Sequence, residues 1–234
     1  MQGCPNRWPP IPRVLLIKGG RMFLVILAGV LLALFVAVWL WQNPGLIRGR
    51  LRAEEIAQFL AQIERLPFPA DQRPELMKRV RAWLQNDDGK PFYMLNLMRY
   101  YPELRPLPNP PAFKGTPRES NARYEAATRS MLFKLGGYPL YAGTPHGKNL
   151  VEYDPALDGW SRLLLVRYPS RRAFLKLLTH PAYRESEPYK LMALQLVLTP
   201  TTPGVVLPSV PMLVGGVLLV VFLAVGWARA AGAF

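Results

Sequence analysis

Few side chains in this chain have the chemistry to bind a ligand, and two of them interrupt one apolar segment. Asn96 and Arg99 lie within Pro91–Tyr100, which is otherwise apolar and aromatic and is predicted to be a buried strand. Asn96 would be the lone polar group on its side of that strand, and a buried amide must find hydrogen-bond partners. Those partners are either neighbouring backbone groups or a bound ligand, and the sequence leaves both interpretations open.

A small-molecule pocket is therefore expected between this strand and the helices that cover it. Such pockets are mostly apolar and contain a few polar groups that orient the ligand. The side chains predicted to line it are Asn96, Arg99, Tyr124, Tyr141, Arg167 and His180. No catalytic residue is assigned, because no clear carboxylate pair, serine–histidine–aspartate order or glycine-rich phosphate loop stands out.

Metal and cofactor chemistry has little support in the composition. The chain has two histidines and one cysteine, which excludes three-histidine sites, cysteine clusters and intrachain disulfides. His180 precedes Pro181 at a predicted helix break, where an imidazole typically satisfies a backbone group; the alternative is an axial haem ligand. His146 lies in a loop rich in glycine and proline and is expected to face solvent. We expect no metal and no cofactor, with haem at His180 as the one alternative.

The elements that must position these residues follow the order strand, helix, strands, helix, strand. The first of these helices has a strong start signal in Thr116-Pro117-Arg118-Glu119, which combines a threonine cap, an early proline and a capping-box glutamate. It is expected to end at Gly136-Gly137, and Ser170 is expected to cap the second helix. The predicted strands are Pro91–Tyr100, Tyr138–Gly143, Asn149–Tyr153, Trp160–Tyr168 and Leu196–Thr199.

This order predicts an α+β, ferredoxin-like domain at residues 91–201, an antiparallel sheet with both helices on one face. Both sides of Pro91–Tyr100 are largely apolar, so both are expected to be buried. The face without helices then needs a cover, most simply a second copy of the chain. A helical linker region at residues 42–90 is predicted to contain helices at Arg52–Leu66 and Pro74–Gln85.

The same part of the chain resembles a known bacterial family. The resemblance rests on four segments in this order: MLNLMRY, GGYPLYAG, WSRLLLVRYPSRRAFLKLLTHPAYRE and ALQLVLTPT. They are similar to the family called domain of unknown function 1330, which belongs to the dimeric α+β barrel superfamily. The resemblance implies sheet-to-sheet pairing with a second domain, but the superfamily includes monooxygenases, isomerases and haem enzymes and does not fix a reaction. Many members carry a His-Arg pair where this chain has Tyr189-Lys190, so catalysis is not carried over.

Two apolar stretches flank the domain and are predicted to be transmembrane helices. Met22–Trp41 has no charge and no proline, and as a helix it would be about 30 Å long, the hydrocarbon thickness of a bilayer. Val205–Ala228 is the second stretch, and residues 1–21 form a proline-rich N-terminal tail. The alternatives are a cleaved signal peptide for the first and a buried core helix for the second. Terminal tryptophans in the first stretch and glycines in the second favour membrane spans.

The formal net charge of +14 suggests an acidic partner. The basic residues are scattered and form no nucleic-acid motif, so membrane lipid is the predicted partner and nucleic acid is not. The distribution of Lys and Arg mildly places both termini in the cytoplasm and the domain in the periplasm or another extracytoplasmic space.

These features predict a membrane-anchored accessory or scaffold protein, an auxiliary subunit of a larger membrane assembly. It would contact itself or another membrane protein through the sheet face and the transmembrane helices. The alternative is a membrane-tethered small-molecule binder or enzyme, of monooxygenase or isomerase type, that acts on a hydrophobic compound. The sequence leaves open whether the protein is an enzyme and favours a non-enzymatic role.

Overall fold

The computed structural model describes residues 36–66, 71–107, 110–151, 154–202 and 210–232, together with a few positions between 22 and 33. The chain divides into two units, Met1–Thr201 and Thr202–Phe234. The first unit contains the predicted α+β domain. The second contains one helix, α8 (Val210–Ala230).

A four-stranded antiparallel sheet forms the centre of the first unit. Its strands are β1 (Phe92–Tyr100), β2 (Tyr138–Gly143), β3 (Arg162–Tyr168) and β4 (Leu194–Thr201), in the order β2-β3-β1-β4. The predicted strand at Asn149–Tyr153 is corrected: residues 149–151 are not in a strand, and 152–153 lie outside the described residues. Asn149 instead donates from its backbone nitrogen to the Asp158 carboxylate (2.9 Å), so a loop side chain satisfies a donor that a strand would have paired.

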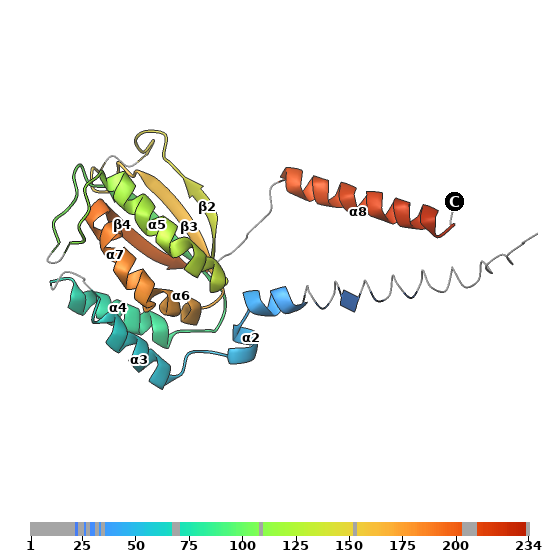
Figure 1. Cartoon of the computed structure of the whole chain (residues 1–234), viewed down its shortest axis with the longest axis horizontal. Helices are drawn as coiled ribbons and strands as arrows, with labels where there is room; N and C mark the ends of the chain where they lie inside the picture. The colour runs from blue at the N-terminus through green and yellow to red at the C-terminus, as the bar shows by residue number, and fades with distance from the viewer. Residues whose placement is uncertain are drawn as a thin grey trace, which may run out of the picture. The chain divides into compact units, whose positions relative to one another are not determined.

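Three helices cover one face of this sheet: α5 (Pro117–Lys134), α6 (Arg171–Leu178) and α7 (Pro181–Ala193) (Figure 1). The predicted capping box of α5 is confirmed, since the Glu119 carboxylate accepts from the Thr116 backbone nitrogen (2.7 Å) and the Thr116 hydroxyl accepts from the Glu119 nitrogen (3.3 Å). Ser170 caps α6 in the same way, by accepting from the Ala173 nitrogen. After α5 the chain turns at Gly136 with a φ of 78°, a value that glycine adopts without a steric cost.

Alternation along β1 divides its side chains between the two faces of the sheet. Phe92, Met94, Asn96 and Met98 face the helices and are buried. At one end of this face, the Phe92 ring stacks on Tyr168 at 5.4 Å and meets Phe174 edge-on at 5.9 Å. This aromatic cluster closes the core between β1, β3 and α6.

Helices α2 (Gly45–Arg48), α3 (Ala53–Ile63) and α4 (Arg73–Gln85) precede the sheet. Leu60, Ile63 and Leu84 bury themselves against Leu175 of α6, which is fully inaccessible. The Arg172 guanidinium of α6 holds the same region by two bonds of 2.9 Å to the Glu55 carboxylate and by bonds to the carbonyls of residues 49 and 50. The predicted linker helices are therefore packed parts of the domain.

Within the described part of the chain, no helix is both long enough and apolar enough to cross a bilayer. Much of the predicted span at 22–41, and residues 205–209 of the second predicted span, lie outside the described residues. The described side chains of α8 that are large and apolar are exposed, among them Val217, Val220 and Trp227. Membrane anchoring stays a prediction.

The Glu55–Arg172 ion pair makes the free energy of unfolding of the domain depend on pH in the acidic range. Arg172 donates hydrogen bonds to the Glu55 carboxylate and lowers its pKa from 4.5 to about 2. A carboxyl group with a depressed pKa stabilises the fold above its unfolded value and loses this contribution as the pH falls from 4.5 towards 2. We expect Glu55→Gln to lower the free energy of unfolding at pH 7 and to have little effect near pH 2, as measured by urea unfolding.

Glu54→Gln is the matched control, because Glu54 is the exposed neighbour of Glu55 on the same helix. Its stability should follow that of the unmodified chain at every pH. If both variants lost the same stability across the whole pH range, the assignment of the acid dependence to Glu55 would be wrong.

Candidate functional site

A cavity of about 300 Å³ lies between the sheet and its covering helices. Strands β1 and β3 supply most of its floor, α5 supplies most of the opposite wall, and α6 and α7 complete that wall. Its apolar surface comes from Met94, Met98, Leu132, Leu164, Val166, Phe174, Leu177 and Leu198, among others. Its polar side chains are Asn96, Asn121, Tyr124, Glu125, Thr128, Arg129, Arg162, Tyr168, Tyr183 and Lys190.

Asn96 provides a polar group in the floor of this cavity. It is 6% exposed, and its amide nitrogen donates to the carbonyls of Met94 (2.9 Å) and Leu164 (3.2 Å). Both neighbours are acceptors, so the amide must present its nitrogen to them. Among the described residues no donor bonds the other amide atom, Oδ1, which leaves an acceptor for a ligand.

A charged network lies along one end of the cavity. Arg162 of β3 donates to the Glu125 carboxylate at 2.6 Å, and the Asn121 amide donates to the same oxygen at 2.8 Å. Asn121 also donates to the Tyr100 hydroxyl at 3.2 Å. Burial opposes the charge on Arg162, but Glu125 outweighs it and raises the pKa of the guanidinium. These groups largely satisfy one another and fix this end of the cavity.

Two tyrosines and a lysine line the wall where α5 meets α7. The Tyr124 and Tyr183 hydroxyls lie 3.4 Å apart, and the Lys190 ammonium lies 5.0 Å from the centre of the Tyr124 ring. Burial raises the pKa of Tyr183 well above 10, so its phenol stays protonated at neutral pH, and it accepts a hydrogen bond from the Tyr124 hydroxyl. The wall is therefore aromatic, with a single cation over one of its rings.

Glu187 lies on the same helix, between Tyr183 and Lys190 in the sequence. It is 4% exposed, and its Oε2 atom has no hydrogen-bond partner among the described residues. Burial raises the pKa of this carboxyl to about 7, although Lys190 and Arg184 act to lower it. A buried carboxylate without hydrogen bonds is costly, so below about pH 7 the neutral acid predominates.

Of the six side chains predicted to share a pocket, the structure brings together Asn96 and Tyr124 in the cavity. Arg99 is corrected: three residues after Asn96, it lies on the opposite face of β1. There it donates to the carbonyls of Ala156 (3.1 Å) and Asp158 and stacks on Trp160 at 4.8 Å. It holds a loop instead of lining the cavity.

Tyr141, Arg167 and His180 also lie outside the cavity. Tyr141 pairs with Leu165 on the sheet face without helices and is 59% exposed. Arg167 on that face donates to the side-chain and backbone oxygens of Gln42 (3.0 Å to the backbone oxygen). His180 caps α7, and its Nδ1 accepts from the Ala182 nitrogen at 3.2 Å. Side-chain alternation along the strands places Tyr141 and Arg167 on the face away from the cavity. His180 is engaged in capping α7.

Four further polar residues line the cavity and are not among the six predicted side chains: Asn121, Glu125, Thr128 and Lys190. Asn121, Glu125 and Thr128 lie with Tyr124 on one face of α5. Because residues three or four apart share a helix face, the predicted position of Tyr124 in the cavity also implies that these three residues line it. The family resemblance marks Tyr189-Lys190 as the position of a His-Arg pair, but only the packing of α7 on α5 puts Lys190 over the Tyr124 ring.

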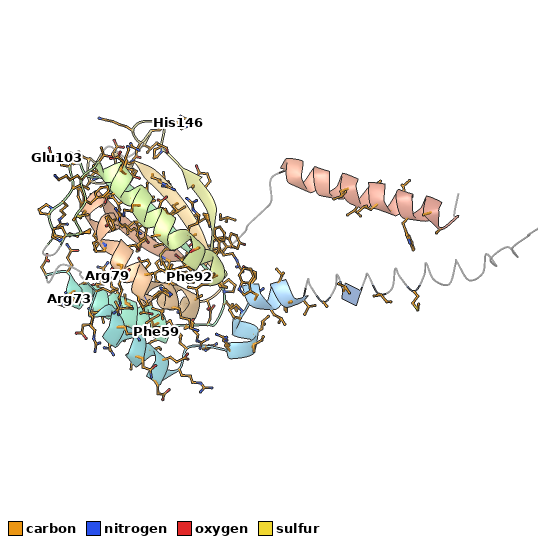
Figure 2. All side chains as sticks on the ribbon, in the orientation of Figure 1. Phe59, Arg73, Arg79, Phe92, Glu103 and His146 are labelled. Carbon is orange, nitrogen blue, oxygen red and sulfur yellow. The ribbon has the colours of Figure 1, made fainter. Side chains whose placement is uncertain are left out.

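No group of three or more potential metal ligands occurs in the part of the chain that the structure describes. His146 is exposed and lies in the loop that follows β2 (Figure 2). A wider and more open hollow of about 740 Å³ lies near α3, but it is lined mainly by polar and charged side chains such as Arg172 and Glu55, which already pair with each other. The cavity under α5 is the better candidate for a small-molecule site.

No family model matches the chain, and none of the curated proteins is similar to it. The predicted relation to domain of unknown function 1330 therefore stays a prediction. Among solved structures, RPA0582, a protein of unknown function from Rhodopseudomonas palustris, is 26% identical, covers 61% of this chain and 98% of its own, and gives a TM-score of 0.47. The methylated form of RPA0582 is 27% identical, covers 59% of this chain and 97% of its own, and gives a TM-score of 0.46.

SnoaB, a cofactor-independent oxygenase from Streptomyces nogalater, is a further similar structure. It is 15% identical, covers 51% of this chain and 99% of its own, and gives a TM-score of 0.33. These similarities do not assign a function to the present chain.

The buried carboxyl of Glu187 should make the domain less stable as the pH rises. Its pKa is raised from 4.5 to about 7, so the folded state keeps a proton that the unfolded chain releases between these values. This contribution is complete below pH 4.5 and is lost by about pH 7, and it amounts to up to about 3 kcal/mol. We expect Glu187→Gln to remove this part of the pH dependence in urea unfolding.

Glu185→Gln provides the control, because Glu185 is exposed on the same helix. It should keep the pH dependence of the unmodified chain. A Glu187→Gln variant whose stability still fell in parallel with that of the unmodified chain between pH 4.5 and 7 would show that Glu187 is ionised throughout.

Proposed function

We propose that the domain binds a compact, largely apolar molecule in the cavity between the sheet and α5. The observation that carries this proposal is the cavity of about 300 Å³ with the Asn96 amide in its floor. This volume is at the lower end of the range for small-molecule sites. A ligand with one hydroxyl or N–H group would supply the donor that Asn96 Oδ1 lacks among the described residues.

The polar groups of the cavity are better suited to hold a ligand than to transfer protons. Glu125 already accepts bonds from Arg162 and Asn121, and Tyr183 is a neutral phenol. A general acid–base pair needs groups that change protonation near the working pH and that reach the substrate. A binding role is therefore the proposal, and the monooxygenase or isomerase alternative stays a prediction.

Filling the cavity should abolish binding. Thr128 of α5 lines the cavity and is buried, and Thr128→Phe would occupy the space of a ligand. We expect compact neutral aromatic compounds, such as 2-naphthol, to bind the full chain in ligand-observed NMR, and the variant to weaken this binding by about tenfold or more.

Ala127→Phe introduces the same side chain at the neighbouring, exposed position of α5 and should bind as the unmodified chain does. Circular dichroism and urea unfolding of both variants separate loss of the cavity from loss of the fold. Equal binding by a folded Thr128→Phe variant would place the ligand elsewhere.

A second candidate is an accessory subunit at a membrane surface, which a specific group of exposed side chains favours. The residues just before and in α2 expose large apolar groups: Trp39 (49%), Trp41 (49%), Leu46 (62%) and Ile47 (71%). The next basic residues are Arg48, Arg50 and Arg52. Tryptophans followed by arginines are typical of the boundary between a bilayer and anionic head groups.

In this second candidate, the sheet face without helices would contact a partner, most simply another copy of the chain. Leu95, Leu97, Leu163 and Leu165 lie on that face and are half-buried, and Val197 is 39% exposed. Pairing of two such faces would give a ferredoxin-like dimer of the α+β barrel type.

Membrane anchoring can be measured by fractionation of cells that express the intact chain. We expect it in the membrane pellet after washing with alkaline carbonate. Arginines at the centres of both apolar stretches, Ala33→Arg with Val220→Arg, should reduce this fraction, because each costs about 3 kcal/mol in a membrane helix. The matched pair Ala57→Arg with Ala126→Arg, at exposed positions of the domain, should not. An intact chain that stays in the supernatant without detergent would exclude this candidate.

A further inference from the structure

We propose that the ligand of the cavity is an organic anion with an apolar body, and that its acidic group binds the Lys190 ammonium. This inference rests on the proposed binding function and names the class of molecule that the same cavity would take. It follows from the position of Lys190, from the groups around it and from the charges along the cavity.

Lys190 is a cavity residue whose ammonium forms no ion pair with a carboxylate among the described residues. Its ammonium lies over the Tyr124 ring at 5.0 Å, and none of the four ion pairs found in that part of the chain includes it. The side chain is only partly exposed. A half-buried ammonium that rests on an aromatic face keeps hydrogens free for an acceptor.

The nearest acidic residue along the helix, Glu187, acts on Lys190 only through its charge and forms no ion pair with it among the described residues. Glu187 lies three positions before Lys190 and is buried, and its Oε2 atom has no hydrogen-bond partner in the described residues. No ion pair joins the two side chains in that part of the chain. The raised pKa of Glu187 also weakens its attraction for Lys190, because the neutral acid predominates below about pH 7.

The other charged groups of the cavity add to the positive field. Arg162 and Glu125 form a pair and nearly cancel. Arg129 is an exposed cation at the edge of the cavity and is in none of the ion pairs of the described residues. Three cations therefore face one carboxylate along the lining, and the whole chain carries +14. Such a field favours the approach and retention of anions.

The apolar lining of the cavity indicates that the rest of the ligand is apolar. Leu164, Val166 and Leu198 line the cavity beside Asn96, so an inorganic anion would leave apolar surface without contacts. A carboxylate with an aromatic or aliphatic body places its charge at Lys190 and its apolar atoms on the leucines and valine. Charge-assisted hydrogen bonds of this kind are about twice as strong as neutral ones.

The test compares two probes of nearly equal shape, 2-naphthoate and 2-naphthamide, with the purified full chain in titration calorimetry. We expect naphthoate to bind about tenfold or more tightly than naphthamide, because only naphthoate can pair with the ammonium. Lys190→Met should remove this preference by weakening naphthoate and leaving naphthamide nearly unchanged. Lys190→Arg should keep most of it. Acetate, which has the charge without the apolar body, should bind far more weakly than naphthoate.

Lys134→Met is the matched control, because Lys134 is exposed at the end of α5 and outside the cavity lining. It should bind both probes as the unmodified chain does. If both probes bound equally to the unmodified chain, or if Lys190→Met kept the preference for naphthoate, the inference would be overturned while the binding function stood. If neither probe nor any neutral compound bound, the proposed function itself would fail, and this inference with it.

Discussion

The alternation of side chains along β1 controls which residues can share a ligand. β1 is paired on both sides, to β3 and to β4, so its register is held by two ladders and cannot slip by one residue without turning every side chain over. This constraint places Asn96 under the helices, where it lines the cavity. It sends Arg99, three positions later, to the other face, where it holds the loop that contains Ala156 and Asp158.

The contact between α5 and α7 determines the electrostatics of the cavity. It buries Tyr183 and Glu187 and brings the Lys190 ammonium over the Tyr124 ring. Burial keeps the Tyr183 phenol and, below about pH 7, the Glu187 carboxyl group neutral, because a charge loses its hydration in an apolar interior. The Lys190 ammonium is therefore available to pair with a ligand. The contact between α5 and α7 that stabilises the helices also produces the proposed preference for an anion.

Much of the fold follows from local signals in the sequence. The capping box at Thr116 and the cap at Ser170 begin their helices as predicted, since a cap is satisfied by residues within one turn. The strand order along the chain is predicted as well, except at 149–151, where the Asp158 side chain takes the donor of Asn149. That loop contact links residues nine positions apart, and neither propensity nor periodicity reports it.

Burial and side-chain alternation act within a few residues, so the position of an apolar strand with one amide in the core could be predicted from the sequence. The distant side chains that meet this amide depend on how the helices pack on the sheet. Asn96 and Tyr124 converge, whereas Arg167 is used by Gln42 and His180 by the start of α7. The contact of Lys190 with the Tyr124 ring depends on the packing of one helix on another. The physical reason is that a polar residue is bound by whichever group lies nearest in space, and that neighbour depends on how elements far apart in the chain pack together.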